Sequence, residues 1–267
     1  MTTKHQITPV QRLKNTLNAE SVQAQFRNAL ADNAPLFIAS LIDIYSSDKG
    51  LQECEPSAVI MEALKAATLK LPINKNLGFA YIVPFKEKGK PKPQMIIGYK
   101  GLIQLAMRTG EYRFINADTI YEGELKSNNK LTGEIDISGE RTSDKVIGYF
   151  AYLETLNGFT KTIFSTEEQV RAHGKKHSSA FSSSFSPWQS DFESMALKTL
   201  LRKLISKWGI MSVEMVGAID RDIEAESRMD TSHEANSELL DIDDPNIIDA
   251  DFKEQPSEEP EQAQPDF

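Results

Sequence analysis

The sequence predicts an α+β fold with N-terminal helices, central antiparallel β-hairpins with an intervening helix, a long basic C-terminal helix and a disordered acidic tail. Three observations predict it. Apolar residues follow helical spacing before Asn76, aromatic and β-branched residues gather in short runs after it, and helical spacing returns from Thr166. Helices and strands do not alternate along the chain, which excludes a doubly wound parallel sheet.

The N-terminal part carries signals for four helices. Thr8-Pro9-Val10-Gln11 is typical of a helix start, because threonine caps, proline fits the first turn and glutamine reaches back to the cap. Proline also opens the fourth helix and is expected to end it. The expected helices follow Thr8, carry Val22 to Leu30, run from near Pro35 to about Asp48, and run from Pro56 to Pro72.

The central part predicts hairpins. Two strands are expected, at Phe79–Phe85 and Met95–Tyr99, and a basic tip, Lys86–Pro93, is expected to join them. A helix is expected from Tyr99 to Thr109, closed by Gly110. The pair Asn157-Gly158 is a tight-turn signal. Further strands are expected at Arg113–Tyr121, Lys145–Thr155 and Phe159–Ser165, and further helices at Thr166–His173 and Gln189–Trp208.

The net charge of −9 averages two unlike segments. Positions 221–267 hold 3 basic and 16 acidic residues, whereas positions 1–220 hold 27 basic and 23 acidic residues. We therefore expect a folded domain over residues 1–225 and a largely disordered acidic tail over residues 226–267. This asymmetry indicates either a nucleic-acid binder with a partner-binding tail or a tail that only keeps the chain in solution.

Several classes of protein are excluded by what the sequence lacks. The single cysteine, Cys54, forms no internal disulfide, and neither a signal peptide nor a run of about 18 apolar residues is present, so we expect a soluble cytoplasmic protein. There is no G-x-x-x-x-G-K-[ST] loop to hold a nucleoside triphosphate, which argues against an ATP-driven strand-exchange protein or helicase.

The helix after Tyr99 carries the first candidate site. Lys100, Gln104 and Arg108 stand at i, i+4 and i+8 and therefore share one face, with spacing that suits successive phosphate oxygens. A solvated amphipathic face is the alternative.

The helix Gln189–Trp208 carries the second candidate site. Lys198, Arg202, Lys203 and Lys207 lie opposite an apolar stripe, and no acid falls between Ser194 and Gly209. Because unbalanced cations repel one another, this pattern favours an anion lying against them. The alternative is a solvated basic face.

Two basic loops are weaker candidates. The hairpin tip carries Lys86, Lys88, Lys90 and Lys92, and either contacts phosphates or is an ordinary soluble loop. Lys175 and Lys176 precede a serine-rich segment that either orders on a DNA strand or is a plain loop. A zinc site at His173 and His177 is disfavoured, because no cysteine or carboxylate pair completes the ligands.

One catalytic alternative remains open. Asp118 with Glu124 and Lys126 is similar to the acid pair and lysine of Mg²⁺-dependent nucleases. The spacing is short and Gly123 interrupts the strand, so a charged turn is the competing interpretation.

Three blocks of sequence resemble the RecT/Red-beta family of phage single-strand DNA annealing proteins, most closely its RecT branch. The likeness covers roughly Ala58 to Ile210. The blocks are Leu77-Gly78-Phe79-Ala80-Tyr81-Ile82-Val83-Pro84-Phe85, Gly98-Tyr99-Lys100-Gly101-Leu102-Ile103-Gln104-Leu105-Ala106, and Ser186-Pro187-Trp188-Gln189 continuing to Lys198-Thr199 and Arg202-Lys203-Leu204.

The resemblance implies an ATP-independent annealer that forms rings or helical filaments on single-stranded DNA and pairs complementary strands. It implies a partner exonuclease and contacts with the host single-strand binding protein, no catalytic residue, and no cofactor beyond Mg²⁺ as a DNA counterion. The family's basic groove maps onto Lys100, Arg108, Lys198, Arg202, Lys203 and Lys207. Tyr99, Gln104 and Trp188 lie in the matching blocks and are included among the expected DNA-binding residues. A non-catalytic adaptor that docks acidic proteins remains the alternative outside nucleic-acid chemistry.

Overall fold

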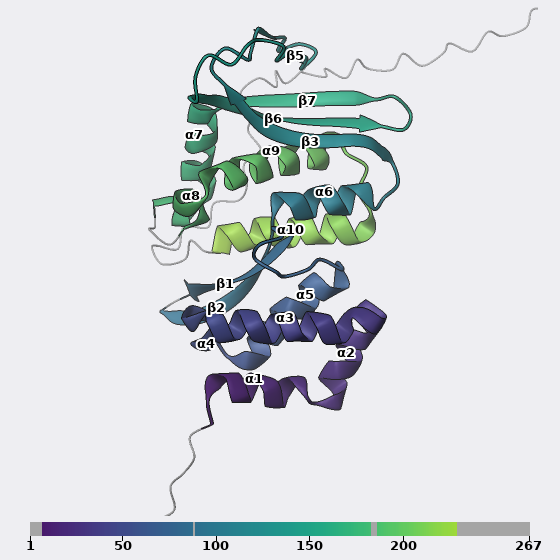
Figure 1. Cartoon of the computed structure of the whole chain (residues 1–267), viewed down its shortest axis with the longest axis vertical. Helices are drawn as coiled ribbons and strands as arrows, with labels where there is room; N and C mark the ends of the chain where they lie inside the picture. Colours follow the sequence, from purple (N-terminus) through teal and green to yellow (C-terminus); the bar gives the residue numbers. More distant parts are fainter. Residues whose placement is uncertain (1–6, 88, 183–185, 229–267) are drawn as a thin grey trace, which may run out of the picture. The chain divides into compact units, whose positions relative to one another are not determined.

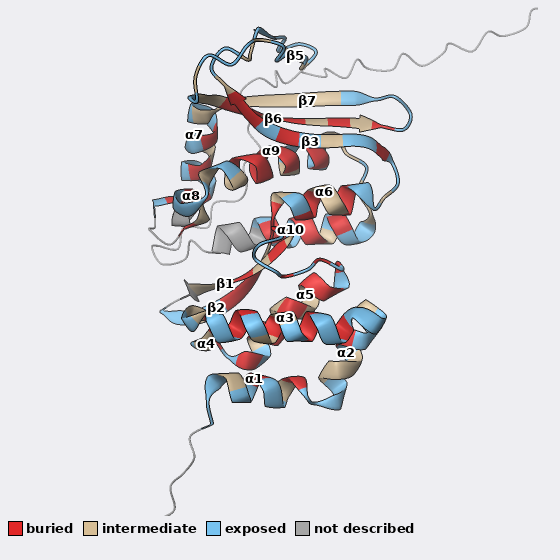
Figure 2. Ribbon diagram, viewed as in Figure 1, coloured by how far each residue is buried: buried red, intermediate tan, exposed pale blue. Residues whose placement is uncertain are grey.

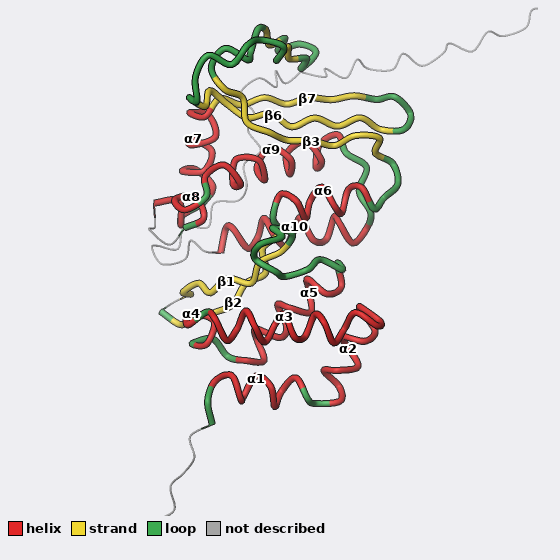
Figure 3. Tube along the Cα trace, viewed as in Figure 1, coloured by secondary structure: helices red, strands yellow, loops and turns green. Residues whose placement is uncertain are grey.

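The computed structural model of the chain describes residues 7–87, 89–182 and 186–228. The chain divides into two units, Met1–His233 and Glu234–Phe267, and the second lies outside the described residues. Residues 226–228 of the predicted tail belong to helix α10 (Val213–Arg228), and the disorder of residues 229–267 stays a prediction. The mixed α+β class with antiparallel sheets is confirmed (Figure 1 and Figure 3).

Two of the N-terminal helices, α1 (Pro9–Leu17) and α4 (Lys49–Gln52), begin at side-chain capping hydrogen bonds. The Thr8 side chain accepts a hydrogen bond from the Gln11 amide at 3.2 Å, which confirms the predicted start of the first helix. Asp48 caps the short fourth helix through the Leu51 amide at 3.2 Å. The helices are α1 (Pro9–Leu17), α2 (Glu20–Leu30), the 3₁₀ turn η1 (Ala31–Asn33), α3 (Ala34–Ser47), α4 (Lys49–Gln52) and α5 (Pro56–Thr68).

Helix α5 ends before Pro72, where the sequence predicts its end. Lys70 takes a left-handed conformation with φ of 52°. Its amide bonds to the Ala67 carbonyl at 2.9 Å, and the Leu71 amide bonds to the Ala66 carbonyl at 3.0 Å. This pair of bonds is a Schellman motif, which normally uses glycine at the left-handed position, so composition gave no signal for it.

A hairpin of β1 (Ala80–Glu87) and β2 (Lys90–Ile97) follows α5. The strands pair antiparallel from Ala80 opposite Ile97 to Glu87 opposite Lys90. The predicted eight-residue basic tip was therefore wrong in extent, because most of it belongs to the two strands. Proline is tolerated here because a two-stranded sheet consists only of edge strands.

A second, three-stranded antiparallel sheet has the order β3-β6-β7. On β6 the side chains of Tyr149, Ala151, Leu153 and Thr155 are buried, and this alternation marks the face that packs against a helix. The strands are β3 (Tyr112–Tyr121), β6 (Val146–Thr155) and β7 (Thr160–Thr166), close to the predicted ranges, and a small hairpin of β4 (Ser127–Asn128) and β5 (Ile135–Asp136) lies between β3 and β6 in the chain.

Helix α9 packs against all three strands of this sheet, and α6 packs against α9 (Figure 1). The predicted helix over Gln189–Trp208 is divided at Asp191, whose side chain caps α9 through the Ser194 amide at 3.1 Å. The helices of this part are α6 (Tyr99–Met107), α7 (Glu167–His177), η2 (Ser179–Ser182), α8 (Pro187–Ser190), α9 (Phe192–Trp208) and α10 (Val213–Arg228).

Helix α10 was missed by the sequence analysis. It contacts β2, and Met215, Ala218 and Ile219 are buried along one side of it. The buried residues of unit 1 form one cluster that runs from α1 to α10 (Figure 2). In the part of the chain that the structure describes, no helix is long and apolar enough to cross a lipid bilayer.

Candidate nucleic-acid interface

Two glycines allow the segment before β1 to lie directly against the start of α6. A Cβ atom on Gly98 would overlap the Gly78 carbonyl oxygen, and one on Gly101 would overlap the Phe79 carbonyl oxygen. Gly78 itself has φ of 73°, a conformation that side chains disfavour. These glycines therefore fix the position of Phe79 beside the first turn of α6.

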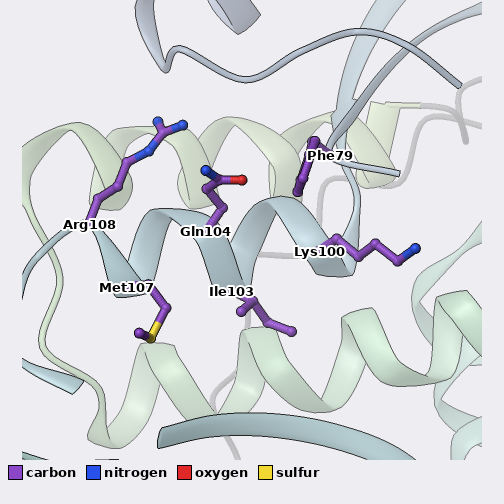
Figure 4. A pocket seen from close by; sticks show the side chains of 6 residues that line it. All are labelled: Phe79, Lys100, Ile103, Gln104, Met107 and Arg108. Atoms are coloured by element: carbon purple, nitrogen blue, oxygen red, sulfur yellow. The ribbon is translucent and has the colours of Figure 1, made fainter. Parts of the chain in front are cut away.

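A cavity of about 460 Å³ lies along α6 at this contact. Figure 4 shows Gln104 and Arg108 pointing toward the side of the helix on which Phe79 lies, with Ile103 and Met107 on the other side. The walls of the cavity are mainly apolar. The charged groups in its lining are Lys100, near the start of α6, and Arg108, just after the end of α6. The lining residues are Phe79, Lys100, Ile103, Gln104, Met107 and Arg108.

Arg108 has a structural role besides its predicted one. Its guanidinium donates to the Leu69 carbonyl at 2.6 Å and to the Lys70 carbonyl at 2.9 Å. These carbonyls end α5, so Arg108 ties α6 to the C-terminus of α5, where a cation is favourable. Burial lowers the pKa of Arg108 from its usual value, although an arginine remains protonated at neutral pH.

Tyr99 and Lys100 adjoin at the start of α6. The Lys100 ammonium lies 5.9 Å from the centre of the Tyr99 ring, and Lys100 is exposed. Burial, followed by the charges of Glu193 and Asp191, raises the pKa of Tyr99. Tyr99 is therefore partly covered and faces an acidic neighbourhood, whereas Lys100 faces solvent.

The basic face predicted on α9 is not exposed as a whole. Lys198 is 2 % exposed, and its ammonium lies 2.8 Å from the carboxylate of Asp222, which is 3 % exposed. Arg202 lies 3.4 Å from the same oxygen. Of the four cations predicted on this face, Lys198 and Arg202 are not exposed, because Asp222 of α10 lies against them.

Lys203 and Lys207 remain exposed on α9. The Lys207 ammonium lies 4.8 Å from the centre of the Trp208 ring, and that of Lys161 lies 5.2 Å from the same ring. A tryptophan face attracts cations, so these two lysines converge on one aromatic side chain at the end of α9.

Trp188 lies in the protein interior. It is 5 % exposed and packs between Phe181 and Phe192, with ring centres 5.4 Å and 5.7 Å away. A Cβ on Gly174 of α7 would collide with the rings of Phe181 and Trp188. In this structure Trp188 offers no face on which a base could stack, so its role is packing.

The remaining predicted residues whose side chains the structure describes lie on two other elements, α7 and β2. Lys175 and Lys176 are exposed in the last turn of α7, and Lys90 and Lys92 are exposed at the start of β2. Lys88 and the side chain of Lys86 lie outside the described residues.

The alternative metal and nuclease sites receive no support from the geometry. The Glu124 carboxylate accepts the Tyr121 amide at 2.8 Å and so closes a turn, while Asp118 accepts the neighbouring Thr119 amide at 2.8 Å. The His173 and His177 rings stack with centres 4.4 Å apart. Across residues 7–87, 89–182 and 186–228, no group of three or more His, Cys, Asp or Glu side chains is placed to hold a metal ion.

The sequence analysis missed Asp222 and Phe79. A signal for Asp222 exists, because Met215, Ala218 and Ile219 precede it at i, i+3 and i+4, with Asp222 itself at i+7 on the same helical face. An acid on an apolar face indicates a buried partner of opposite charge. No comparable signal marks Phe79, whose place depends on the glycine contacts.

The arrangement is that of an α+β protein with an apolar cavity along α6, lined by the cations Lys100 and Arg108. The model of the RecT family matches residues 36–236, which include α6, α9 and Asp222. A Bacillus subtilis (strain 168) protein, "Uncharacterized protein YqaK", is 47% identical over 244 residues, covering 89% of this chain and 83% of its own length. "Protein RecT" of Escherichia coli (strain K12) is 30% identical over 181 residues, covering 64% of this chain and 65% of its own length. The chain belongs to the RecT family.

Proposed function

We propose that this protein binds single-stranded DNA and anneals complementary strands in homologous recombination, without ATP and without catalysing a covalent reaction. Membership of the RecT family carries the proposal, since the matched residues contain every element of the α6 site. Exposed cations beside an apolar cavity support it, because single strands present both phosphates and base faces.

The α6 surface, defined as Lys100, Gln104 and Arg108, is the part of the site that would hold the phosphate backbone. Residues four apart on a helix lie about 6 Å from one another, which allows one strand to follow the helix. Phosphate contacts carry no sequence information and leave the Watson–Crick edges free. Base pairing with a second strand then supplies the free energy, and Mg²⁺ acts only as a counterion.

Cations also lower the repulsion between two strands. Each neutralised phosphate releases condensed counterions, which favours binding at low salt. Exposed Lys203 and Lys207 on α9 are further candidates for phosphate contacts. Lys175, Lys176, Lys90 and Lys92 are exposed candidates for further phosphate contacts.

We further propose that the protein acts as an oligomer or filament on DNA in a phage or prophage recombination system. Assembly would align many sites along one strand and make binding cooperative. An exonuclease that exposes the strand and the host single-strand binding protein are the proposed partners. The acidic residues 226–267 are the proposed docking segment for one of them.

Annealing of two complementary labelled oligonucleotides, followed by fluorescence without nucleotide, tests the proposal. The variant is Lys100→Glu/Lys203→Glu, in which both changed side chains are exposed. The matched control is Lys126→Glu/Lys130→Glu, which makes the same charge change on the exposed segment between β3 and β6. We expect faster annealing with the native chain and the control, and loss of the effect in the variant.

Strand length and binding at moderate salt are measured in the same samples. Intact strands with no acceleration by the native chain would contradict the annealing function. Mg²⁺-dependent shortening that disappears in Asp118→Ala would instead indicate a nuclease, and absence of DNA binding would indicate an adaptor.

A further inference from the structure

Three donors converge on the carboxylate of Asp222 in the interior of unit 1. The Lys198 ammonium lies 2.8 Å from one carboxylate oxygen, and Arg202 lies 3.4 Å from the same atom. The backbone amide of Ile97, at the end of β2, donates to the other oxygen at 3.1 Å. Two cations and an N–H thus surround one anion carried by α10.

This donor set has the chemistry of a phosphate site. Arginine, lysine and backbone amides are the groups that bind phosphate oxygens, and they bind carboxylates in the same geometry. Ile97 lies three residues before Lys100, so the amide and the exposed lysine are within about 10 Å along the chain. The Ile97 amide therefore lies close, along the chain, to the first residue of the proposed phosphate-binding surface on α6.

Burial of this ion pair is a poor way to stabilise the fold. Removing two charges from water costs several kcal/mol, and well-packed apolar residues at such sites are often as stable or more so. Stability therefore does not explain this buried charged cluster. Exchange of the Asp222 carboxylate for a phosphate of DNA does explain it.

Over residues 213–223, the part of α10 whose side chains the structure describes, three apolar side chains pack into the core. Met215, Ala218 and Ile219 are buried, whereas Val213 is 87 % exposed and Val216 is 41 % exposed. A helix with few buried apolar side chains belongs to the least stable part of a fold and is released first. The segment that links α9 to α10 runs from Gly209 to Ser212.

We propose that Lys198, Arg202 and the Ile97 amide form a phosphodiester-binding site that Asp222 occupies until single-stranded DNA displaces α10. This inference rests on the proposed function, because the displacing ligand is the bound strand. Helix α10 acts as an internal competitor, and its release exposes Lys198 and Arg202 to the strand. Binding is thereby coupled to the release of α10.

Substitution of one carboxylate tests the coupling. Asp222→Asn keeps an acceptor for the Ile97 amide but removes the competing charge, whereas Asp220→Asn makes the same net-charge change at an exposed position of α10. We expect Asp222→Asn to bind a labelled single strand more tightly than Asp220→Asn at low salt. Its salt dependence should be steeper by about one to two counterions. Equal affinities and slopes would overturn the inference.

A second variant changes the outcome in the opposite direction. Lys198→Met/Arg202→Met/Asp222→Leu replaces all three charged side chains with apolar ones, so that no buried charge loses its partner within the cluster and α10 stays docked. We expect weaker strand binding and a shallower salt dependence than in the native chain. Unchanged binding would overturn the inference, since the pair would then serve packing alone.

Hydrogen exchange of the native full-length chain gives a reading that does not depend on any variant folding. On saturation with a single strand, we expect faster exchange in α10 and slower exchange in α6. Protection of α6 with unchanged or slower exchange in α10 would overturn the coupling while leaving the annealing function intact. Absence of any binding would remove both.

Discussion

The two basic helices of the domain show the same sequence pattern in opposite surroundings. Lys100 and Gln104 on α6, like Lys198 and Arg202 on α9, stand four residues apart on one face. Lys100 is exposed beside a cavity, whereas Lys198 is buried against an acid. Periodicity thus establishes which residues share a face but not whether that face meets solvent.

The difference between the helices comes from a later segment of the chain. Lys198 and Arg202 on α9 contact Asp222 of α10, which lies 20 or more positions farther along the chain. An argument from neighbours at i+3 and i+4 considers only acids on the same helix. It therefore pointed to an external anion for these cations, whereas the carboxylate that lies against Lys198 and Arg202 belongs to the same chain.

The largest expected effect on stability comes from the buried Lys198 of α9. Lys198→Ala leaves the Asp222 carboxylate with fewer partners in the interior, which should lower the free energy of unfolding by about 3–5 kcal/mol. The exposed control, Lys203→Ala, should change it by no more than about 0.5 kcal/mol. Urea unfolding followed by circular dichroism measures both. Similar midpoints for the two variants would show that α10 does not cover Lys198 in solution.

The glycine contacts that shape the α6 cavity give the second effect. Gly101→Ala places a methyl group into the Phe79 carbonyl, which should destabilise the fold by about 1–3 kcal/mol. Gly217→Ala is also in a helix, but its nearest neighbour is the Arg221 side chain at 4.0 Å. That change should stabilise the helix by up to about 1 kcal/mol. Melting temperatures that shift in the same direction would contradict the packing of Phe79 against α6.

The same elements show how much the sequence could predict. The fold class, the strand ranges and the Thr8 cap were predicted, because they depend on local periodicity and local hydrogen bonds. The end of α5 was not predicted, because Lys70 takes the left-handed position that glycine normally occupies. The burial of Trp188 was not predicted either, because Phe181 and Phe192 cover its side chain only in the folded structure.

For the candidate site, the sequence located α6 but not its cavity. The spacing of Lys100, Gln104 and Arg108 follows from the helix alone. Phe79 joins them only because Gly98 and Gly101 admit the preceding segment, a contact between residues about 20 positions apart. Arg108 was predicted to contact phosphate. Its hydrogen bonds to the end of α5 could not be predicted, because these partners are distant in the sequence.

Arg108 gives the third effect, because it belongs to both the cavity and the fold. Arg108→Lys keeps the charge but loses the paired contact with the Leu69 and Lys70 carbonyls. We expect a loss of about 1–2 kcal/mol in the free energy of unfolding, measured in urea. A variant as stable as the native chain would show that the end of α5 does not need this cap.

Lys100 should give the smallest effect on stability and the clearest effect on DNA. Its ammonium is exposed, so Lys100→Ala should change the free energy of unfolding by no more than about 0.5 kcal/mol. If the residue contacts a phosphate, the plot of log affinity against log salt should become shallower by about one unit, uniformly across sequences. An exposed lysine away from the cavity, Lys130, provides the control substitution to Ala. A slope that changes equally in both variants would mean that α6 contributes only net charge to DNA binding. The exposure of Lys100 on α6 and the burial of Lys198 on α9 would then make no difference to how DNA binds.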